Sequence, residues 1–174
     1  MDVTARTTAT TLKRILVGLD GSSGSSRALA WAIGLAKTLD AEILAAHVFQ
    51  LIPSGIVAYG LTPVTVPEEW VTDVRRLFEN EWTAPLKNAG VRYRTIFDEG
   101  TPAQRLIGIA NDEHVDLIVT GNRGLGGFRE LVLGSVSQQL VLHAHVPVVI
   151  IPAEHKKPIE QPATIGARAT AAPE

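Results

Sequence analysis

The sequence contains no cysteine among its 174 residues. This absence excludes disulfide bonds, a thiolate nucleophile and cysteine-ligated zinc, and it fits a reducing compartment, so we expect a cytoplasmic protein. A strong charge of either sign is also lacking, because the formal net charge is −2. The sequence therefore gives no electrostatic reason to expect binding to nucleic acid or to an anionic membrane.

An uninterrupted membrane-spanning run is lacking as well. Residues 43–67 carry no Asp, Glu, Lys or Arg and would be long enough to cross a bilayer. Three prolines and two glycines interrupt this run, so we predict no transmembrane helix. Residues 1–11 are rich in Thr and Ala without an apolar centre, and they are predicted to be a disordered lead rather than a secretory signal.

The most informative feature that is present is a glycine-rich segment. It reads Gly121-Asn122-Arg123-Gly124, then nine residues, then Gly134-Ser135-Val136-Ser137. The apolar run 115–120 predicts a strand before it, and the spacing of Val136, Leu140 and Val141 predicts a helix after it. A helix start offers N–H groups and a positive dipole end to an anion, and glycine lets phosphate approach the backbone. The segment therefore predicts a phosphate cradle and nucleotide binding.

Two common phosphate-binding patterns do not fit this segment. The P-loop pattern needs a lysine after its last glycine, whereas Ser135 follows Gly134. The dinucleotide pattern would begin at Gly124 and Gly126, but Arg129 stands where its third glycine belongs. A glycine-rich surface loop without a ligand is the alternative interpretation.

Apolar runs alternate with helical patterns along the chain. Strands are predicted at residues 13–19, 42–49, 91–97, 115–120 and 146–151. Helices are predicted after the turn at 20–25, over 67–90 with a kink at Pro85, over 101–113, and after the glycine segment, while 50–66 is predicted as a loop. This alternation implies a parallel sheet with helices on both faces, in one α/β domain at 12–153 followed by a disordered tail at 154–174.

The helical patterns also predict which side chains are buried. Trp31, Trp70 and Trp82 stand on apolar stripes and are predicted to be core residues rather than stacking platforms. The predicted buried stripe of the helix over 67–90 consists of Trp70, Val74, Leu77, Phe78 and Trp82. The segment Thr101-Pro102-Ala103-Gln104 is predicted to form a capping box with proline in the first helical turn.

Two loops follow the carboxyl ends of predicted strands, where ligands of parallel sheets bind. One is Asp20-Gly21-Ser22 after the first strand, and the other is the glycine segment after the fourth. If these strands are neighbours, the carboxylate of Asp20 faces the cradle. Because a carboxylate repels phosphate, we expect Asp20 to contact ribose hydroxyls or an adenine edge, and a helix N-cap is its alternative role.

The chain resembles the universal stress protein family, in its single-domain, ATP-binding, actinobacterial-like form. The resemblance rests on the G-x2-G-x9-G-[ST] segment together with ILVGLDGS, AAHVF, EGTP and HAHVPVVIIP, and it covers roughly residues 12–152. It implies a Rossmann-like, five-stranded parallel sheet of order 3-2-1-4-5 with helices on both faces. It also implies a homodimer that pairs the edge strand Val146–Ile151, because an uncovered apolar edge is normally paired or blocked.

The resemblance implies roles for individual residues as well. Asp20 is implied to meet the ribose or adenine, and Asn122 stands where the family would have Ser or Thr, which leaves one hydroxyl contact missing. The base is implied to lie against Gly18, Leu19 and the backbone of His47 and Val48. The ribose and phosphates are implied to lie on Thr120, Gly121, Gly124, Gly134, Ser135, Val136 and Ser137.

Three functions remain open. The first is a regulatory module in stress adaptation that binds ATP, which is expected to carry Mg²⁺. The second is an ATP-hydrolysing or nucleotidyl-transferring enzyme, and the third is a cyclic AMP-binding protein. Phosphoryl transfer needs a cationic clamp, a metal site and a positioned base, whereas the segment offers Arg123, Arg129 and only Glu130 as an acid. We therefore predict binding with slow or no hydrolysis and no catalytic residue. Arg123 either contacts phosphate or is solvated, and His143 and His145 diverge on a helix, so no metal site is predicted.

Overall fold

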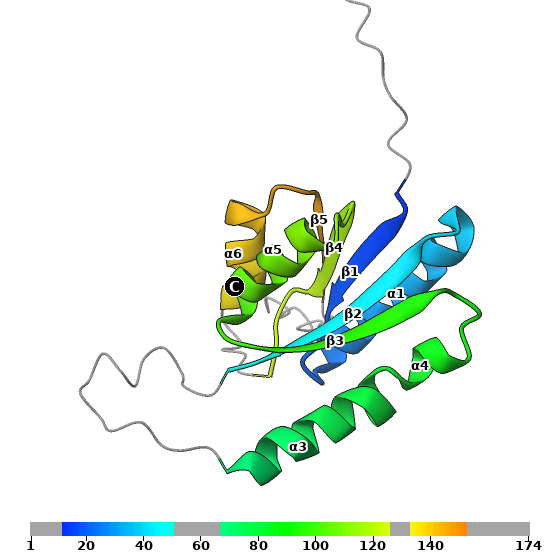
Figure 1. Cartoon of the computed structure of the whole chain (residues 1–174). Coiled ribbons are helices and arrows are strands. Elements are labelled where there is room, and N and C mark those ends of the chain that lie inside the picture. Colours follow the sequence, from blue (N-terminus) through cyan, green and yellow to red (C-terminus); the bar gives the residue numbers. More distant parts are fainter. Residues whose placement is uncertain (1–11, 51–66, 126–132, 153–174) are drawn as a thin grey trace, which may run out of the picture.

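The computed structural model describes residues 12–50, 67–125 and 133–152. The lead at 1–11, most of the loop at 50–66 and the tail at 154–174, for which the sequence makes predictions, lie outside these residues. Figure 1 shows one sheet with helices packed against it.

Five strands form a single parallel sheet of order β3-β2-β1-β4-β5, as predicted. They are β1 (Arg14–Gly18), β2 (Glu42–Phe49), β3 (Tyr93–Glu99), β4 (Leu117–Gly121) and β5 (Val148–Ile151). Strand β3 lies two residues later than predicted because it pairs with β2 as far as Glu99 opposite Phe49. Strand β5 begins two residues later than predicted, directly after Pro147, which has no N–H to give to a ladder.

The helices are α1 (Ser23–Leu39), α3 (Glu68–Leu77), α4 (Ala84–Lys87), α5 (Pro102–Asp112) and α6 (Ser135–His143). In place of the helix predicted over 67–90 with a kink at Pro85, a π-helical turn (Phe78–Trp82) separates α3 from α4. The N–H of Thr83 donates to the carbonyl of Phe78 at 3.1 Å, five residues back. The break lies just before Pro85, whose ring excludes a normal helical turn, so the predicted kink is confirmed.

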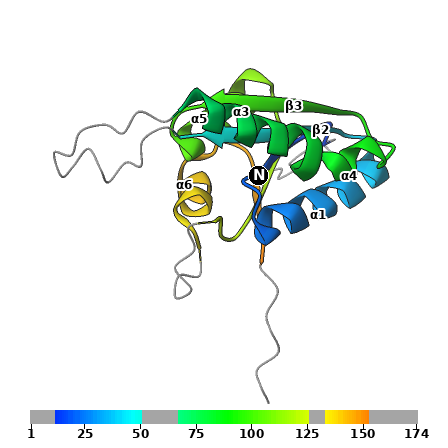
Figure 2. The same cartoon turned by 90° about the horizontal axis from the view of Figure 1, so that it is seen from below.

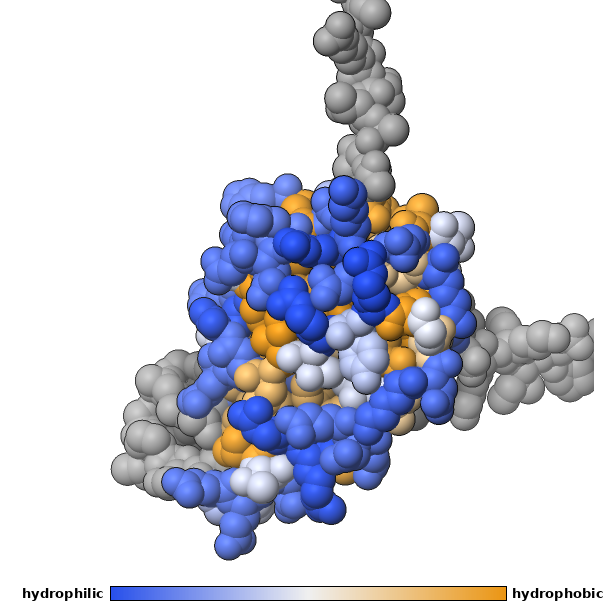
Figure 3. All heavy atoms as spheres, turned by 45° about the vertical axis from the view of Figure 1, so that its right-hand side comes forward, coloured by the Kyte–Doolittle hydropathy of each residue, from blue (hydrophilic) through white to orange (hydrophobic). Residues whose placement is uncertain are grey.

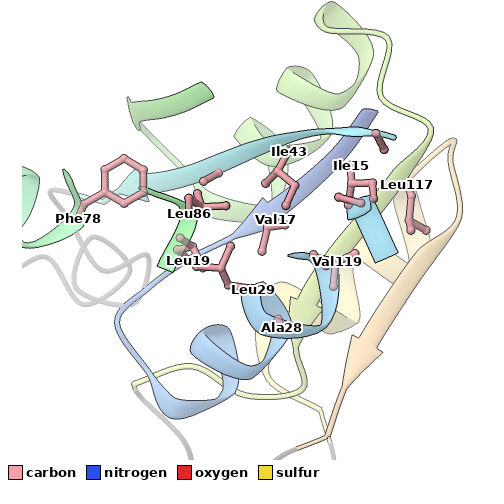
Figure 4. Packing of buried hydrophobic residues seen from close by; sticks show 14 residues of the cluster. Ile15, Val17, Leu19, Ala28, Leu29, Ile43, Phe78, Leu86, Leu117 and Val119 are labelled. Carbon is pink, nitrogen blue, oxygen red and sulfur yellow. The ribbon is translucent and has the colours of Figure 1, made fainter. Parts of the chain in front are cut away.

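Two hydrophobic clusters lie on opposite faces of the sheet, because successive side chains of a strand point to opposite faces. One joins α1, Phe78 and Leu86 to Ile15, Val17, Ile43 and Val119 (Figure 4). The other joins residues of α5 and α6 to Leu16, Leu44 and Ile118. Helices therefore cover both faces, as predicted, and Figures 1 and 2 show this arrangement from two directions.

Several side chains predicted to be buried are exposed. Trp31 is 42% exposed and Trp70 is 64% exposed, while Trp82 is half-buried. Helix α1 buries a side built largely of alanines, such as Ala28 and Ala32, and this close packing leaves Trp31 outside the interface. Figure 3 shows one face of the protein, on which hydrophobic residues are exposed between hydrophilic ones.

The helix predicted after the glycine segment is α6, and one further local prediction needs correction. Val141, part of the spacing that predicts α6, is 54% exposed, because α6 packs through Leu140 and Ser137. Thr101 stands at the N-cap of α5 with Pro102 next to it, as predicted, but its side chain makes no capping hydrogen bond. Proline in the first helical turn has no N–H, so this helix start has one unsatisfied donor fewer even without the box. None of the helices in the described part of the chain has the length and apolar character that crossing a bilayer requires.

Candidate nucleotide-binding site

The two informative loops meet at one edge of the sheet. Strand β1 pairs directly with β4, with Ile15 opposite Leu117 and Val17 opposite Val119, so their carboxyl ends lie side by side. Strand order reverses at this pair, which is the position where open parallel sheets bind ligands. A cavity of about 1050 Å³ opens there, at the upper end of the usual size for small-molecule sites.

Every residue predicted for the site lines this cavity. They are Gly18, Leu19, Asp20, His47, Val48, Thr120, Gly121, Arg123, Gly124, Gly134, Ser135, Val136 and Ser137. Residues far apart in the chain are thus brought together by the pairing of β1 with β2 and β4. Arg129 and Glu130 lie outside the described residues.

The carboxylate of Asp20 faces the glycine segment, as predicted. Its Oδ1 accepts hydrogen bonds from the backbone N–H of Ser22 at 3.0 Å and from the Ser22 hydroxyl at 2.6 Å. Its Oδ2 accepts from the N–H of Leu125 at 3.2 Å. The alternative role of Asp20 as a helix N-cap is wrong, because Ser22 caps α1 by accepting from the N–H of Ser25 at 3.1 Å. Asp20 instead fixes the cap and ties it to the glycine segment.

The two ends of the glycine segment are joined through the backbone of Asn122. Its N–H donates to the carbonyl of Ile151 at 2.9 Å, and its carbonyl accepts from the N–H of Gly134 at 2.7 Å. The buried hydroxyl of Ser137 lies 3.0 Å from the same carbonyl. Ser137 lines the cavity, but its hydroxyl holds the glycine segment in shape. The predicted contact of Ser137 with phosphate would therefore be made by its backbone N–H. Because both bonds of Asn122 are made by its backbone, this link does not depend on the Ser or Thr hydroxyl that is lacking here.

Glycines 24 and 121 allow α1 and β4 to approach each other backbone to backbone. A Cβ placed on Gly121 would lie 2.7 Å from the carbonyl carbon of Gly24, and one placed on Gly24 would lie 2.8 Å from the carbonyl oxygen of Arg123. Neither distance occurs for a real Cβ, so any larger residue must push the helix away. Gly121 is therefore required by packing inside the protein, independently of any ligand.

The start of α6 is the polar wall of the cavity. Its N-cap is Gly134, which has no side chain to bond the first N–H groups of the helix. These groups, beginning at Ser135, have no acceptor within the helix and carry the positive end of its dipole. Ser135 adds an exposed hydroxyl. This arrangement is suited to a phosphate group.

The rest of the cavity lining is mostly apolar, including an apolar wall formed by Val74, Leu77 and Trp82, and the sequence did not predict it. The missed lining residues are Ser25, Ala46, Phe49, Gln50, Val74, Leu77, Trp82, Pro102, Leu106 and Leu125. Val74, Leu77 and Trp82 belong to the stripe that the sequence assigns to a core, since a helical stripe does not tell whether it faces a sheet or a cavity. One feature of the sequence could have indicated that this stripe borders a cavity: it directly follows the charge-free segment 43–67.

His47 lies within an aromatic group beside the apolar wall. Its Nδ1 is 2.7 Å from the carbonyl oxygen of Leu19, which fixes the ring orientation. Its ring meets that of Trp82 edge to face, with centroids 5.0 Å apart. Burial lowers the pKa of His47 below the ordinary value of 6.5, against the opposing effects of the Leu19 carbonyl and the negative charge of Asp20.

The lowered pKa of His47 predicts a pH-dependent stability. Below pH 6.5 the unfolded chain takes up a proton that the folded protein binds less readily, so the unfolding free energy falls as the pH drops from 6.5 toward the folded pKa. Denaturant unfolding across this range should show the fall, and His47→Gln, which cannot titrate, should flatten it. An NMR titration that finds the His47 ring protonating at or above 6.5 would contradict the assignment.

Comparison with known proteins gives the family. The profile described as "Universal stress protein family" matches residues 11–152. The chain belongs to the universal stress protein family. The universal stress protein YxiE of Bacillus subtilis is 35% identical over 146 residues, which cover 79% of this chain and 97% of YxiE. The universal stress protein MJ0531 of Methanocaldococcus jannaschii is 34% identical, with 84% of this chain and 83% of the relative covered.

Solved structures share the fold of this universal stress protein. A family member from Burkholderia pseudomallei has a TM-score of 0.62 at 28% identity, covering 83% of this chain and 98% of that one. A family member from Arabidopsis thaliana solved with AMP bound has a TM-score of 0.56 at 21% identity, covering 87% and 99%. Another, solved in complex with cAMP, has a TM-score of 0.57 at 24% identity, covering 82% and 98%. The last two likenesses are of fold alone.

Proposed function

We propose that this universal stress protein binds ATP in the cavity between β1 and β4 and acts as a regulatory nucleotide-sensing module in stress adaptation, without appreciable hydrolysis. The observation that carries the proposal is the meeting of three groups in one cavity: the uncapped start of α6, the glycine segment and the Asp20 carboxylate. The absence of cysteine fits the reducing cytoplasm as the proposed location.

The chemistry of the cavity matches the parts of an adenine nucleotide in order. The N–H groups at the start of α6 and the Ser135 hydroxyl suit the phosphates. Asp20 and Thr120 suit the ribose, because a carboxylate and a hydroxyl can both bond to sugar hydroxyls. Leu19 and Val48 offer an apolar surface to the base. That two proteins of this fold were solved with AMP and with cAMP supports an adenine nucleotide as the ligand class.

Magnesium would accompany ATP through its phosphates rather than through a protein site. The described residues contain no group of three His, Cys, Asp or Glu side chains that could hold a metal ion. Mg²⁺ typically keeps several waters and binds through substrate phosphates with few protein carboxylates, so the residues present fit an ion brought in by ATP. Bound there, it would neutralise phosphate charge.

Titration calorimetry with ATP, AMP and cAMP tests the proposed ligand, together with mass spectrometry of nucleotide retained during native purification. We expect ATP to bind most tightly, because the start of α6 offers donors to several phosphates. A preference for cAMP over both linear nucleotides would favour the cAMP alternative. No binding of any of the three would contradict the proposal.

Slow hydrolysis is a separate prediction. The described part of the cavity lining contains Asp20 and Arg123 as its charged groups and no lysine, so the full apparatus of phosphoryl transfer is not assembled there. Purified protein with ATP and Mg²⁺ should release phosphate far more slowly than the roughly 1–1000 per second typical of enzymes. A rate of about one per second that Ser135→Ala abolishes would favour the enzyme alternative instead.

We also propose a homodimer through the β5 edge. Strand β5 is the last strand of the sheet beyond β4, and its residues Val148–Ile151 are only half-buried. An apolar edge strand is normally paired or blocked, and a second copy of the same edge would pair it. Light scattering at micromolar concentration, with and without ATP, should give twice the monomer mass, and a monomer under both conditions would contradict the proposal.

A further inference from the structure

Helix α3 carries an apolar stripe that the protein core does not bury. The stripe consists of Trp70, Val71, Val74 and Leu77, which recur at helical spacing. No residue of α3 is buried. The side of the helix away from the stripe is strongly charged. The charged side carries Glu68, Glu69, Asp73, Arg75 and Arg76. An amphipathic helix with an unburied stripe indicates that something other than the core covers its apolar side.

The carboxyl end of α3 is held firmly, which fixes the direction of the stripe. Phe78, the next residue, is completely buried in the core. The guanidinium of Arg75 lies 4.1 Å from the centre of the Phe97 ring on β3, a cation–π contact. With the helix held in this way, Val74 and Leu77 line the cavity that contains the glycine segment.

Trp70 lies one turn beyond Val74 on the same stripe. Helical side chains lean toward the amino end of their helix, so the indole extends the apolar wall outward from the residues that line the cavity. Figure 1 shows the amino-terminal end of α3 at the same end of the molecule as the carboxyl end of β2. Trp70 is 64% exposed, the most exposed of the three tryptophans in the described residues.

We propose that Trp70 contacts the bound nucleotide, with its indole covering the purine base at the mouth of the cavity. This proposal rests on the proposed function, because it places the base at the apolar end and the phosphates at the start of α6. The purine base is the occupant because the stripe extends outward from the cavity wall formed by Val74, Leu77 and Trp82. A purine presents a flat apolar face that an indole can cover, whereas the stripe offers the phosphate end of the ligand no cation and no donor besides the indole N–H.

Alanine substitution of Trp70 tests the contact against a matched control. Trp70→Ala should weaken AMP and ATP binding by about fivefold to one hundredfold, the range expected when base–aromatic stacking is removed. Trp70→Phe should retain most of the affinity. Trp31→Ala, which removes a side chain of the same size that is also exposed but lies on α1, should leave the affinity unchanged. Inorganic tripolyphosphate should bind wild type and Trp70→Ala alike, because it lacks a base.

The outcomes separate the two proposals. Wild-type protein that binds neither AMP nor ATP would overturn the proposed function itself. Wild-type binding that Trp70→Ala leaves intact would overturn only the role of Trp70. A loss of tripolyphosphate binding in Trp70→Ala equal to the loss of AMP binding would show a general structural defect and would also overturn it.

Fluorine NMR of protein labelled with 5-fluorotryptophan gives an independent readout. The three resonances are assigned from Trp31→Phe, Trp70→Phe and Trp82→Phe variants. We expect AMP to shift the Trp70 resonance and leave that of Trp31 in place. A Trp70 resonance that stays fixed at saturating AMP would overturn the proposal. A resonance that moves on dilution instead would show that a second copy covers the stripe, and would overturn it as well.

Discussion

Replacing Gly124 with valine should weaken ATP binding by at least about tenfold, or roughly 1.4 kcal/mol, while the sheet stays folded. A Cβ on Gly124 would overlap the Asp20 carboxylate. That carboxylate is held by bonds from Ser22 and Leu125 and cannot move without releasing the glycine segment. The branched side chain would therefore displace both the expected ribose contact and the loop that follows β4.

The matched control for this substitution is Gly34→Val. Gly34 lies on the exposed side of α1, where an added Cβ meets nothing within 4 Å, so the same change of residue should leave ATP affinity intact. Titration calorimetry gives the affinities, and circular dichroism establishes that each variant is folded. A folded Gly124→Val protein that binds ATP as tightly as wild type would show that the cradle is wrongly placed.

A second pair of variants separates charge from bulk at the start of α6. A Cβ on Gly134 would lie 3.4 Å from the Cα of Arg123 and 3.5 Å from the carbonyl oxygen of Asn122, so a side chain can be accommodated with little strain. Gly134→Glu would add a negative charge where phosphate should bind, and Gly134→Gln has the same size without the charge. ATP affinity should fall further in the Glu variant than in the Gln variant. Equal affinities would argue against phosphate at this position.

The sequence predicted the sheet and the meeting of the two loops because these depend on strongly patterned segments. The buried strands are short continuous apolar runs, and the order of the sheet follows from the family resemblance. Once β1 and β4 are neighbours, Asp20 and the glycine segment must share an edge of the sheet, and the Oδ2 contact with Leu125 follows from that placement. Local patterns were sufficient here because the chain leaves each parallel strand at the same edge.

The sequence did not predict whether the apolar side of a helix faces the sheet or the cavity. The stripe containing Trp70, Val74 and Leu77 has the same spacing whether it covers a sheet or borders a cavity, so it was assigned to the core. The alternative role of Asp20 as the N-cap of α1 is wrong for a related reason. Asp20 and Ser22 are both good N-cap residues, and only the position of the first helical turn decides in favour of Ser22.

The largest expected loss of stability follows the substitution Phe78→Ala. Phe78 is fully buried, and its ring lies 6.0 Å from those of His47 and Phe97 and 6.3 Å from that of Trp82, between centroids. Removing a buried phenyl ring leaves a cavity that the neighbouring rings cannot fill, so the unfolding free energy should fall by about 3–5 kcal/mol. Denaturant unfolding measures the loss, and a change below about 1 kcal/mol would contradict this account of the core.

Phe78→Ala should also affect nucleotide binding at the candidate site, because Phe78 is the first residue of the π-helical turn that holds α3 and Trp82 against the cavity. We expect weaker AMP binding with little change for tripolyphosphate, since the start of α6 lies on the other wall. Leu29→Ala is the matched control: Leu29 is equally buried in the same cluster on α1 but does not line the cavity. It should lose about 2–5 kcal/mol of stability and keep its AMP affinity under conditions where both variants are folded. If both variants lose AMP affinity equally, the effect comes from general destabilisation, and the turn does not position the apolar wall.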